Sequence, residues 1–168
     1  ANVAATSLAL GTAGTVTVTT SVLTAAQASA LEAKTADINT MTYTVSSTAD
    51  LLIAETTDAF TNATSITVTD ATTVAKIANL NGTGGTHSAD IDLADMVYSL
   101  SDAGTTIAGD TTTMNGAVNI TATGSVTEDE AIILINATNT GTTSIATVDA
   151  TGATNAELAT LADNASNI

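Results

Sequence analysis

Residues 66–80 read ITVTDATTVAKIANL, and this stretch contains both parts of the unit from which the fold is built. Its first part alternates apolar residues with threonine, a period of two that is typical of a strand with one buried and one solvated face. Its second part places Val74, Ile77 and Leu80 three residues apart, on one apolar stripe of a helix. The stretch therefore predicts a strand, a turn at Asp70 and a short helix.

The strand phrase recurs along the chain. Alternating segments of the same kind begin at Val16, Tyr43, Ile66, Tyr98, Ile120 and Ile145. Their spacing is a ragged period of about 25 residues, within the range of solenoid repeats. The chain contains no proline, which agrees with interior strands that donate every amide to a neighbour.

Short helical segments follow most of these strands. Their apolar residues are Leu23, Ala26, Ala30 and Leu31; Leu51, Leu52 and Ile53; Ile132, Leu134 and Ile135; and Leu158 with Leu161. Two of the segments open with a capping box, Thr127 with Glu130 and Thr154 with Glu157. Helices this short are unstable alone, so we expect them to pack on the strands.

These patterns predict a β-solenoid, or α/β solenoid, with about six coils, each a parallel strand followed by a short helix. Crossovers between the parallel strands are expected to be right-handed. We interpret residues 1–168 as one solenoid domain, with a half-coil at 1–15 and repeats over 16–162. The glycine-rich segment within 82–95 is expected to be a loop insertion on one coil.

Composition excludes several classes of function. Two basic residues stand against 17 acidic ones, for a formal net charge of −15, so nucleic acid and anionic membrane surfaces are not expected partners. No segment reaches the 18 apolar residues that a membrane span needs, and without cysteine there is no disulfide or thiolate site. The start at Ala1, without Met or a leader, is interpreted as that of a mature or excised segment.

The phrases YTVSSTADLLIAE (43–55), ITVTDATTVAKIANLN (66–81) and VYSLSDAGTTIAG (97–109) resemble the imperfect Ala/Thr-rich repeats of very large secreted bacterial proteins, of the surface-layer and adhesin kinds. The resemblance covers residues 16–162 and lies in texture more than in an invariant motif. It implies an extracellular or cell-surface location and a structural or adhesive role.

Catalytic equipment is sparse. The only histidine is His87, in a glycine-rich segment, and a Ser/His/Asp arrangement would have to form around it. We therefore predict that the chain is not an enzyme and needs no organic cofactor.

Calcium is the ion that the sequence favours. Asp90, Asp92 and Asp95 bring three carboxylates close together, and such hard oxygen ligands suit Ca²⁺. Neither this cluster nor the acidic residues 128–130 matches an EF-hand or a calcium nonapeptide. The alternative is that such residues cap helices and form turns, as also expected for Asp70, Asp102 and Asp149 after their strands.

The threonines of the strands form a second candidate site. If the alternating apolar residues point inward, a set of threonines points outward, in ranks spaced by the distance between strands. The set is Thr17, Thr19, Thr44, Thr67, Thr69, Thr121 and Thr123. Such a face suits a glycan or another neutral surface, or ice, although threonine is also simply a good residue for a solvated strand.

Open solenoid ends present strand edges and an apolar cross-section. Neither end of this sequence contains an obvious polar cap. We therefore expect head-to-tail self-association into a filament, stalk or surface lattice.

Overall fold

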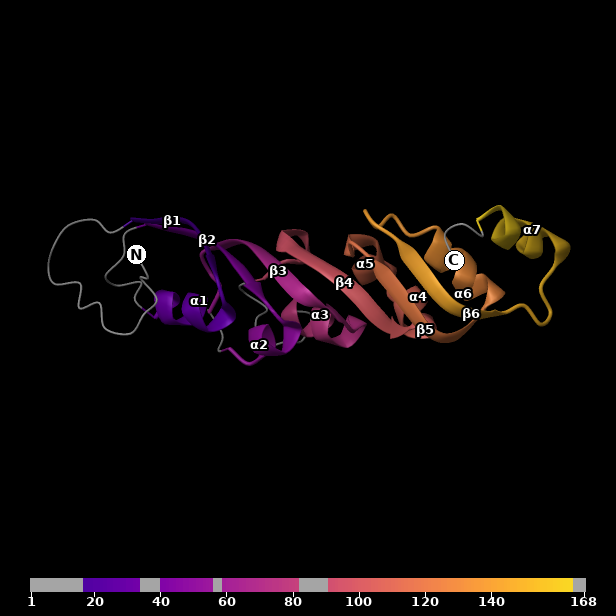
Figure 1. Cartoon of the computed structure of the whole chain (residues 1–168), viewed down its shortest axis with the longest axis horizontal. Coiled ribbons are helices and arrows are strands. Elements are labelled where there is room, and N and C mark those ends of the chain that lie inside the picture. Colours follow the sequence, from indigo (N-terminus) through magenta and orange to yellow (C-terminus); the bar gives the residue numbers. More distant parts are fainter. Residues whose placement is uncertain (1–16, 34–39, 56–58, 82–90, 165–168) are drawn as a thin grey trace, which may run out of the picture. The chain divides into compact units, whose positions relative to one another are not determined.

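The computed structural model describes residues 17–33, 40–55, 59–81 and 91–164. Strands and helices alternate through these residues (Figure 1). The strands are β1 (Thr17–Leu23), β2 (Thr40–Ser47), β3 (Ala63–Thr72), β4 (Met96–Ala103), β5 (Ile120–Thr127) and β6 (Thr143–Asp149). The helices are α1 (Ala25–Glu32), α2 (Ala49–Ile53), α3 (Val74–Leu80), the 3₁₀ helix η2 (Leu93–Asp95), α4 (Gly104–Gly109), α5 (Thr111–Gly116), α6 (Glu128–Ile135) and α7 (Asn155–Asp163).

The strands form one open parallel sheet, in the order β1-β2-β3-β4-β5-β6. Each alternating phrase coincides with one of these strands, except that Val16, the first residue of the first phrase, lies outside the described residues. The sequence prediction of parallel strands alternating with helices is therefore confirmed as an α/β fold. Strand β2 pairs in parallel with β1 and with β3, and β5 pairs in parallel with β4 and with β6.

The chain divides into two compact units. Unit 1 contains Ala1–Asp70 and Ala78–Val97, and unit 2 contains Ala71–Ile77 and Tyr98–Ile168. The half-coil predicted at 1–15 lies outside the described residues. Of the predicted insertion at 82–95, only 91–95 is described, and it includes η2.

Alternate strand residues build the core of each unit, as the period of two predicts. In unit 1, Tyr43 and Val45 of β2 and Ile66 of β3 are buried together with helix residues such as Leu52. In unit 2 the equivalent buried set is Tyr98, Leu100, Ile120, Ala122, Val126, Ile107 and Leu134. The chain has three aromatic residues, Tyr43, Phe60 and Tyr98, and all three side chains are buried in the core.

Helix starts follow the sequence signals. Both predicted capping boxes form, in α6 and in α7, and a third joins Thr24 to Gln27 at the start of α1. The stripe Val74, Ile77 and Leu80 of α3 is buried. Leu23, which the sequence placed on a helix stripe, is instead the last residue of β1.

Helices α4 and α5 were not predicted, because their residues are mostly threonine and glycine, which are poor helix formers. Tertiary packing explains why α4 begins with Gly104. A Cβ at Gly104 would lie 2.1 Å from Val126 Cγ1 on β5. The absence of a side chain lets the first turn of α4 approach the sheet.

Candidate functional site

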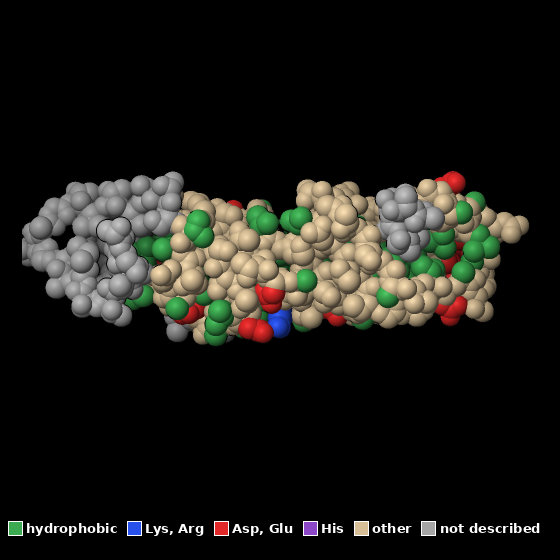
Figure 2. All heavy atoms as spheres, in the orientation of Figure 1, with side chains coloured by type: hydrophobic (Ala, Val, Ile, Leu, Met, Phe, Trp, Pro, Cys, Tyr) green, Lys and Arg blue, Asp and Glu red, His purple; other side chains and the backbone are tan. Residues whose placement is uncertain are grey.

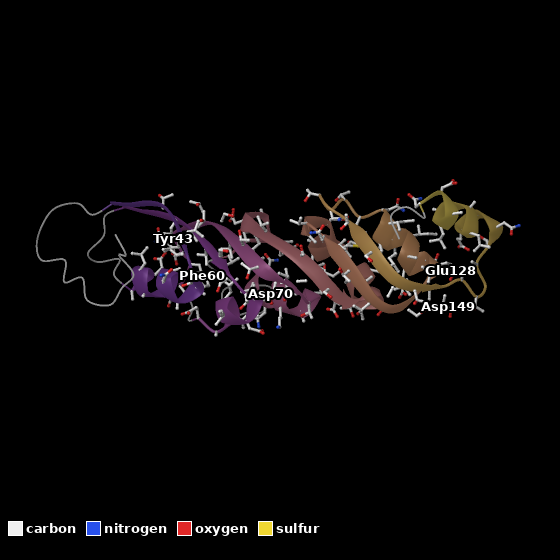
Figure 3. The ribbon with its side chains drawn as sticks, in the orientation of Figure 1. Tyr43, Phe60, Asp70, Glu128 and Asp149 are labelled. Atoms are coloured by element: carbon white, nitrogen blue, oxygen red, sulfur yellow. The ribbon has the colours of Figure 1, made fainter. Side chains whose placement is uncertain are left out.

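Strand-end carboxylates bind the helix of the preceding repeat. The Ala49 N–H at the start of α2 donates to Asp70 Oδ1 of β3 at 2.8 Å. In unit 2, the Val74 N–H at the start of α3 donates to Asp102 Oδ2 of β4 at 3.1 Å. The sequence predicted capping or turn roles for these aspartates, and they do cap helices, but each caps the helix before its own strand. Asp70 is labelled in Figure 3.

Asp149 at the end of β6 behaves differently. Its Oδ1 accepts a hydrogen bond from the Thr151 N–H at 3.0 Å, which makes it a local turn residue. Hydrogen bonds from the Thr151 side chain and backbone hold the pKa of this exposed carboxyl below its ordinary value. Asp149 therefore forms its turn in the role that the sequence predicted.

A second set of polar bonds joins neighbouring repeats of unit 2 where the strands begin. Asn119 donates from its backbone and side-chain nitrogens to Ser99 Oγ, at 3.3 and 3.4 Å. Asn119 Oδ1 in turn accepts from the Thr142 N–H at 3.0 Å and from its hydroxyl at 3.1 Å. A glycine is required at position 141 beside these hydrogen bonds, because a Cβ at Gly141 would lie 2.3 Å from Asn119 Oδ1. Three successive repeats are thereby linked by side chains as well as by the sheet.

Unit 1 contains a buried carboxylate that the sequence did not single out. Glu32, the last residue of α1, is only 8% exposed. The Tyr43 hydroxyl donates to its Oε1, and the backbone N–H and side-chain amide of Asn62 donate to Oε1 and Oε2, both at 2.9 Å. Glu32 thus joins α1, β2 and the segment before β3; its partner Tyr43 is labelled in Figure 3. A glutamate at the end of an Ala-rich helix gives no local signal of burial, so sequence alone could not find this cluster.

The threonine face is mixed with serine. Thr44 lies opposite Ser65 and Thr67 opposite Ser46. In unit 2, Thr121 lies between Ser101 and Ser144, and both Thr121 and Thr123 are exposed. Thr69 of unit 1 is exposed as well. Thr17 and Thr19 lie on β1, opposite Thr40 and Thr42. The registers therefore place threonine opposite threonine between β1 and β2, and threonine opposite serine between β2 and β3 and on both sides of Thr121.

Charge is almost absent from the six described strands. Only Asp70, Asp102 and Asp149 are charged within them, and the first two bind helix amides. The other strand residues are Thr, Ser, Ala, Gly and apolar types. In a chain with a net charge of −15, the strands thus contribute only three of the 17 acidic residues.

The candidate calcium ligands fall partly outside the described residues. Asp90 and also His87 lie there. Asp92 is the N-cap of η2, where its Oδ1 accepts from the Leu93 N–H at 3.0 Å, and Asp95 is the last residue of that turn. In the described part of the chain, no three acidic, histidine or cysteine side chains form a group that could hold a metal ion.

The acidic cluster at 128–130 occupies the first turn of α6. Glu130 Oε2 accepts from the Thr127 N–H at 2.9 Å as half of a capping box. Negative charge at the start of a helix also interacts favourably with the helix dipole. The cluster therefore has a sufficient role in helix stability.

Comparison with protein-family models, with curated proteins and with solved structures finds no match to this chain. Among the described helices, none has the length and apolar character that crossing a bilayer requires. Any proposal of function must therefore start from the residues and contacts above.

Proposed function

We propose that the chain is a structural, non-enzymatic element of an extracellular or cell-surface assembly. In this proposal the repeats form an α/β solenoid, which stacks end to end into a filament, stalk or lattice. The repeating strand-helix unit and the succession of parallel strands in chain order support it.

The contacts between neighbouring repeats carry the proposal. Asp70 and Asp102 each cap the helix of the preceding repeat, and Asn119 joins the repeat before it to the repeat after it. Repeats held by backbone ladders and by side chains resist separation, because several bonds must break together. This arrangement suits a protein that transmits load along a series of coils.

Negative-stain electron microscopy of the purified chain tests this proposal. We expect rods or filaments whose length increases with protein concentration. Dispersed particles of single-chain size at every concentration would contradict end-to-end stacking. A molecule seen to be a compact antiparallel sandwich would contradict the solenoid itself.

A second candidate function is adhesion to a neutral surface. It is favoured by the low charge of the strands and by the hydroxyl rank of Ser101, Thr121 and Ser144, in which Thr121 and Ser144 are exposed and Ser101 is half-buried. Replacing Thr121 by Lys should then abolish retention on an immobilised neutral polysaccharide. Thermal hysteresis in the unmodified protein would identify ice as the surface instead.

Calcium dependence belongs to the same candidate. If Asp90, Asp92 and Asp95 hold Ca²⁺, chelation should lower both the melting temperature and surface binding. The matched control is Asp129→Asn, which removes one exposed carboxylate from α6 and should leave any chelator response unchanged. An Asp92→Asn variant with an undiminished chelator response would place the ion elsewhere.

A further inference from the structure

The last helix of unit 2 lacks the cover that the interior helices have. In α6, Ala131 and Leu134 are fully buried. In α7 no residue is buried, and Leu158 is 44% exposed. Hydrophobic side chains gather over α6 and α7 in the space-filling view (Figure 2). The apolar stripe of α7 therefore has the composition of an interior helix face but not its burial.

The edge of the sheet at β6 also lacks a neighbour among the described strands. Strand β5 pairs with β4 on one side and with β6 on the other. Strand β6 pairs with β5 alone among the strands that the structure describes. Its inward residues are also less covered, since Val148 is only half-buried whereas its partner on β5, Val126, is fully buried. The edge of β6 and the stripe of α7 together form what we call the β6–α7 surface.

We propose that the β6–α7 surface docks β1 and α1 of a second copy of this chain, with β1 adding to the sheet in parallel. This inference rests on the proposed function and names the surface and partner that end-to-end stacking uses. Each interior strand offers one edge to the next strand, and β6 offers the same edge to β1, the strand at the opposite edge of the sheet. Because all paired strands are parallel, a continuing repeat joins head to tail.

The negative charge of the chain determines how docking should respond to salt. Two chains with a net charge of −15 repel each other, and β6 and α7 themselves contain Asp149, Glu157 and Asp163, so the burial of apolar groups must drive the association. Association through this surface should strengthen as salt screens the repulsion. Weakening of association by salt would overturn the proposal, because it would indicate attraction between charged groups instead.

Sedimentation velocity of the full chain tests the surface. We compare the unmodified protein with Leu158→Asp and with Leu51→Asp, a control at a leucine of α2 that is 57% exposed and lies in unit 1. Leu158→Asp should raise the Kd for association about tenfold or more, because docking would bury a carboxylate against apolar groups. Leu51→Asp should associate like the unmodified protein. Circular dichroism melts check that both variants fold.

The outcomes separate the docking surface from the proposed function. If the unmodified protein assembles and Leu158→Asp assembles equally well, the docking surface is wrong and end-to-end stacking stands. If both variants abolish assembly, added charge alone is responsible and the surface is again wrong. If the unmodified protein stays monomeric at every concentration, both proposals fail.

A cysteine variant tests the head-to-tail arrangement. The chain has no cysteine, so Leu158→Cys introduces a single thiol on α7. In a head-to-tail assembly, α7 meets α1 of the next copy, and oxidation leaves the variant uncrosslinked. A disulfide-linked dimer that forms rapidly and in high yield would show that α7 meets α7 across a two-fold axis, and would overturn the proposal.

Discussion

Replacing Glu32 by Gln tests whether the buried carboxylate of unit 1 holds its elements together. Glu32 accepts from the Tyr43 hydroxyl and from both nitrogens of Asn62. Glutamine has nearly the same shape, but it offers one acceptor oxygen and an amide group that donates. At least one of the three donors then faces another donor inside a buried contact.

The magnitude follows from the bonds that are lost. A hydrogen bond to a charged group contributes about 1.5–3 kcal/mol, and a buried donor left unsatisfied costs about 1–3 kcal/mol. We expect Glu32→Gln to lower the free energy of unfolding by about 2–4 kcal/mol. Tyr43→Phe should cost about 1–2 kcal/mol, since it removes one donor and leaves both Asn62 bonds in place. A unit of this size loses roughly 4–8 °C of melting temperature per kcal/mol.

Urea denaturation, followed by circular dichroism and by tyrosine fluorescence, measures these losses. The control is Glu55→Gln, which makes the same chemical change at a partly exposed position of unit 1 and relieves the same amount of negative charge. The double variant Glu32→Gln with Tyr43→Phe should destabilise by less than the sum of the two single changes. If Glu32→Gln unfolds at the same urea concentration as Glu55→Gln, the carboxylate does not join these elements.

Four further predictions concern caps, close contacts and titration. Asp70→Ala should cost about 1 kcal/mol in thermal melts and Asp70→Asn much less, because Asn keeps the accepting oxygen; equal losses would exclude capping. Gly104→Ala should cost about 1–3 kcal/mol by steric conflict, whereas Gly109→Ala, with open space around it, should be neutral or stabilising in the same melts. Hydrogen bonds to the backbone and side chain of Thr154 lower the pKa of Glu157 below 4.5, so the cap should persist above that pH and be lost as pH falls through the lowered pKa. The loss should be seen as faster amide exchange in α7, which Glu157→Ala should show already at neutral pH. Burial, and then the charge of Asp110, raise the pKa of Tyr98 from 10.0 to about 12. The contribution of the neutral Tyr98 phenol to stability should therefore be complete below pH 10 and lost as pH rises through 12. Ultraviolet absorbance should show one phenol titrating near 12, and two phenols titrating near 10 would contradict the prediction.

The sequence predicted the strands better than the helices. Alternation of apolar and hydroxyl residues is a strong signal, and it located all six strands. Capping boxes located the starts of α6 and α7 for the same reason, since each is a local pattern of two residues. The sequence did not predict helices α4 and α5, because threonine and glycine disfavour helices. In α4, packing of Gly104 against β5 overrides that preference.

The candidate site was predictable only where its chemistry is local. Asp70 and Asp102 were expected to cap helices, but their partners lie 21 and 28 residues earlier in the chain, a distance that no local pattern encodes. Glu32 gave no signal at all, because its donors come from β2 and from the segment before β3. Burial of a polar group is a tertiary property, and it depends on which repeats become neighbours.

The polar bonds between repeats explain how a chain of such low complexity can specify one order of strands. Threonine-rich strands with similar alternation can pair in several registers, and a slip of one residue would expose the core face. The bonds that join neighbours are different in each place: Asp70 to Ala49, Asp102 to Val74, and Asn119 to Ser99 and Thr142. A slipped or exchanged strand would leave a carboxylate or an amide without its partner, at a cost comparable to that of losing a helix cap. The irregularity of the repeats is therefore useful, because identical repeats would hold together equally well in the wrong order.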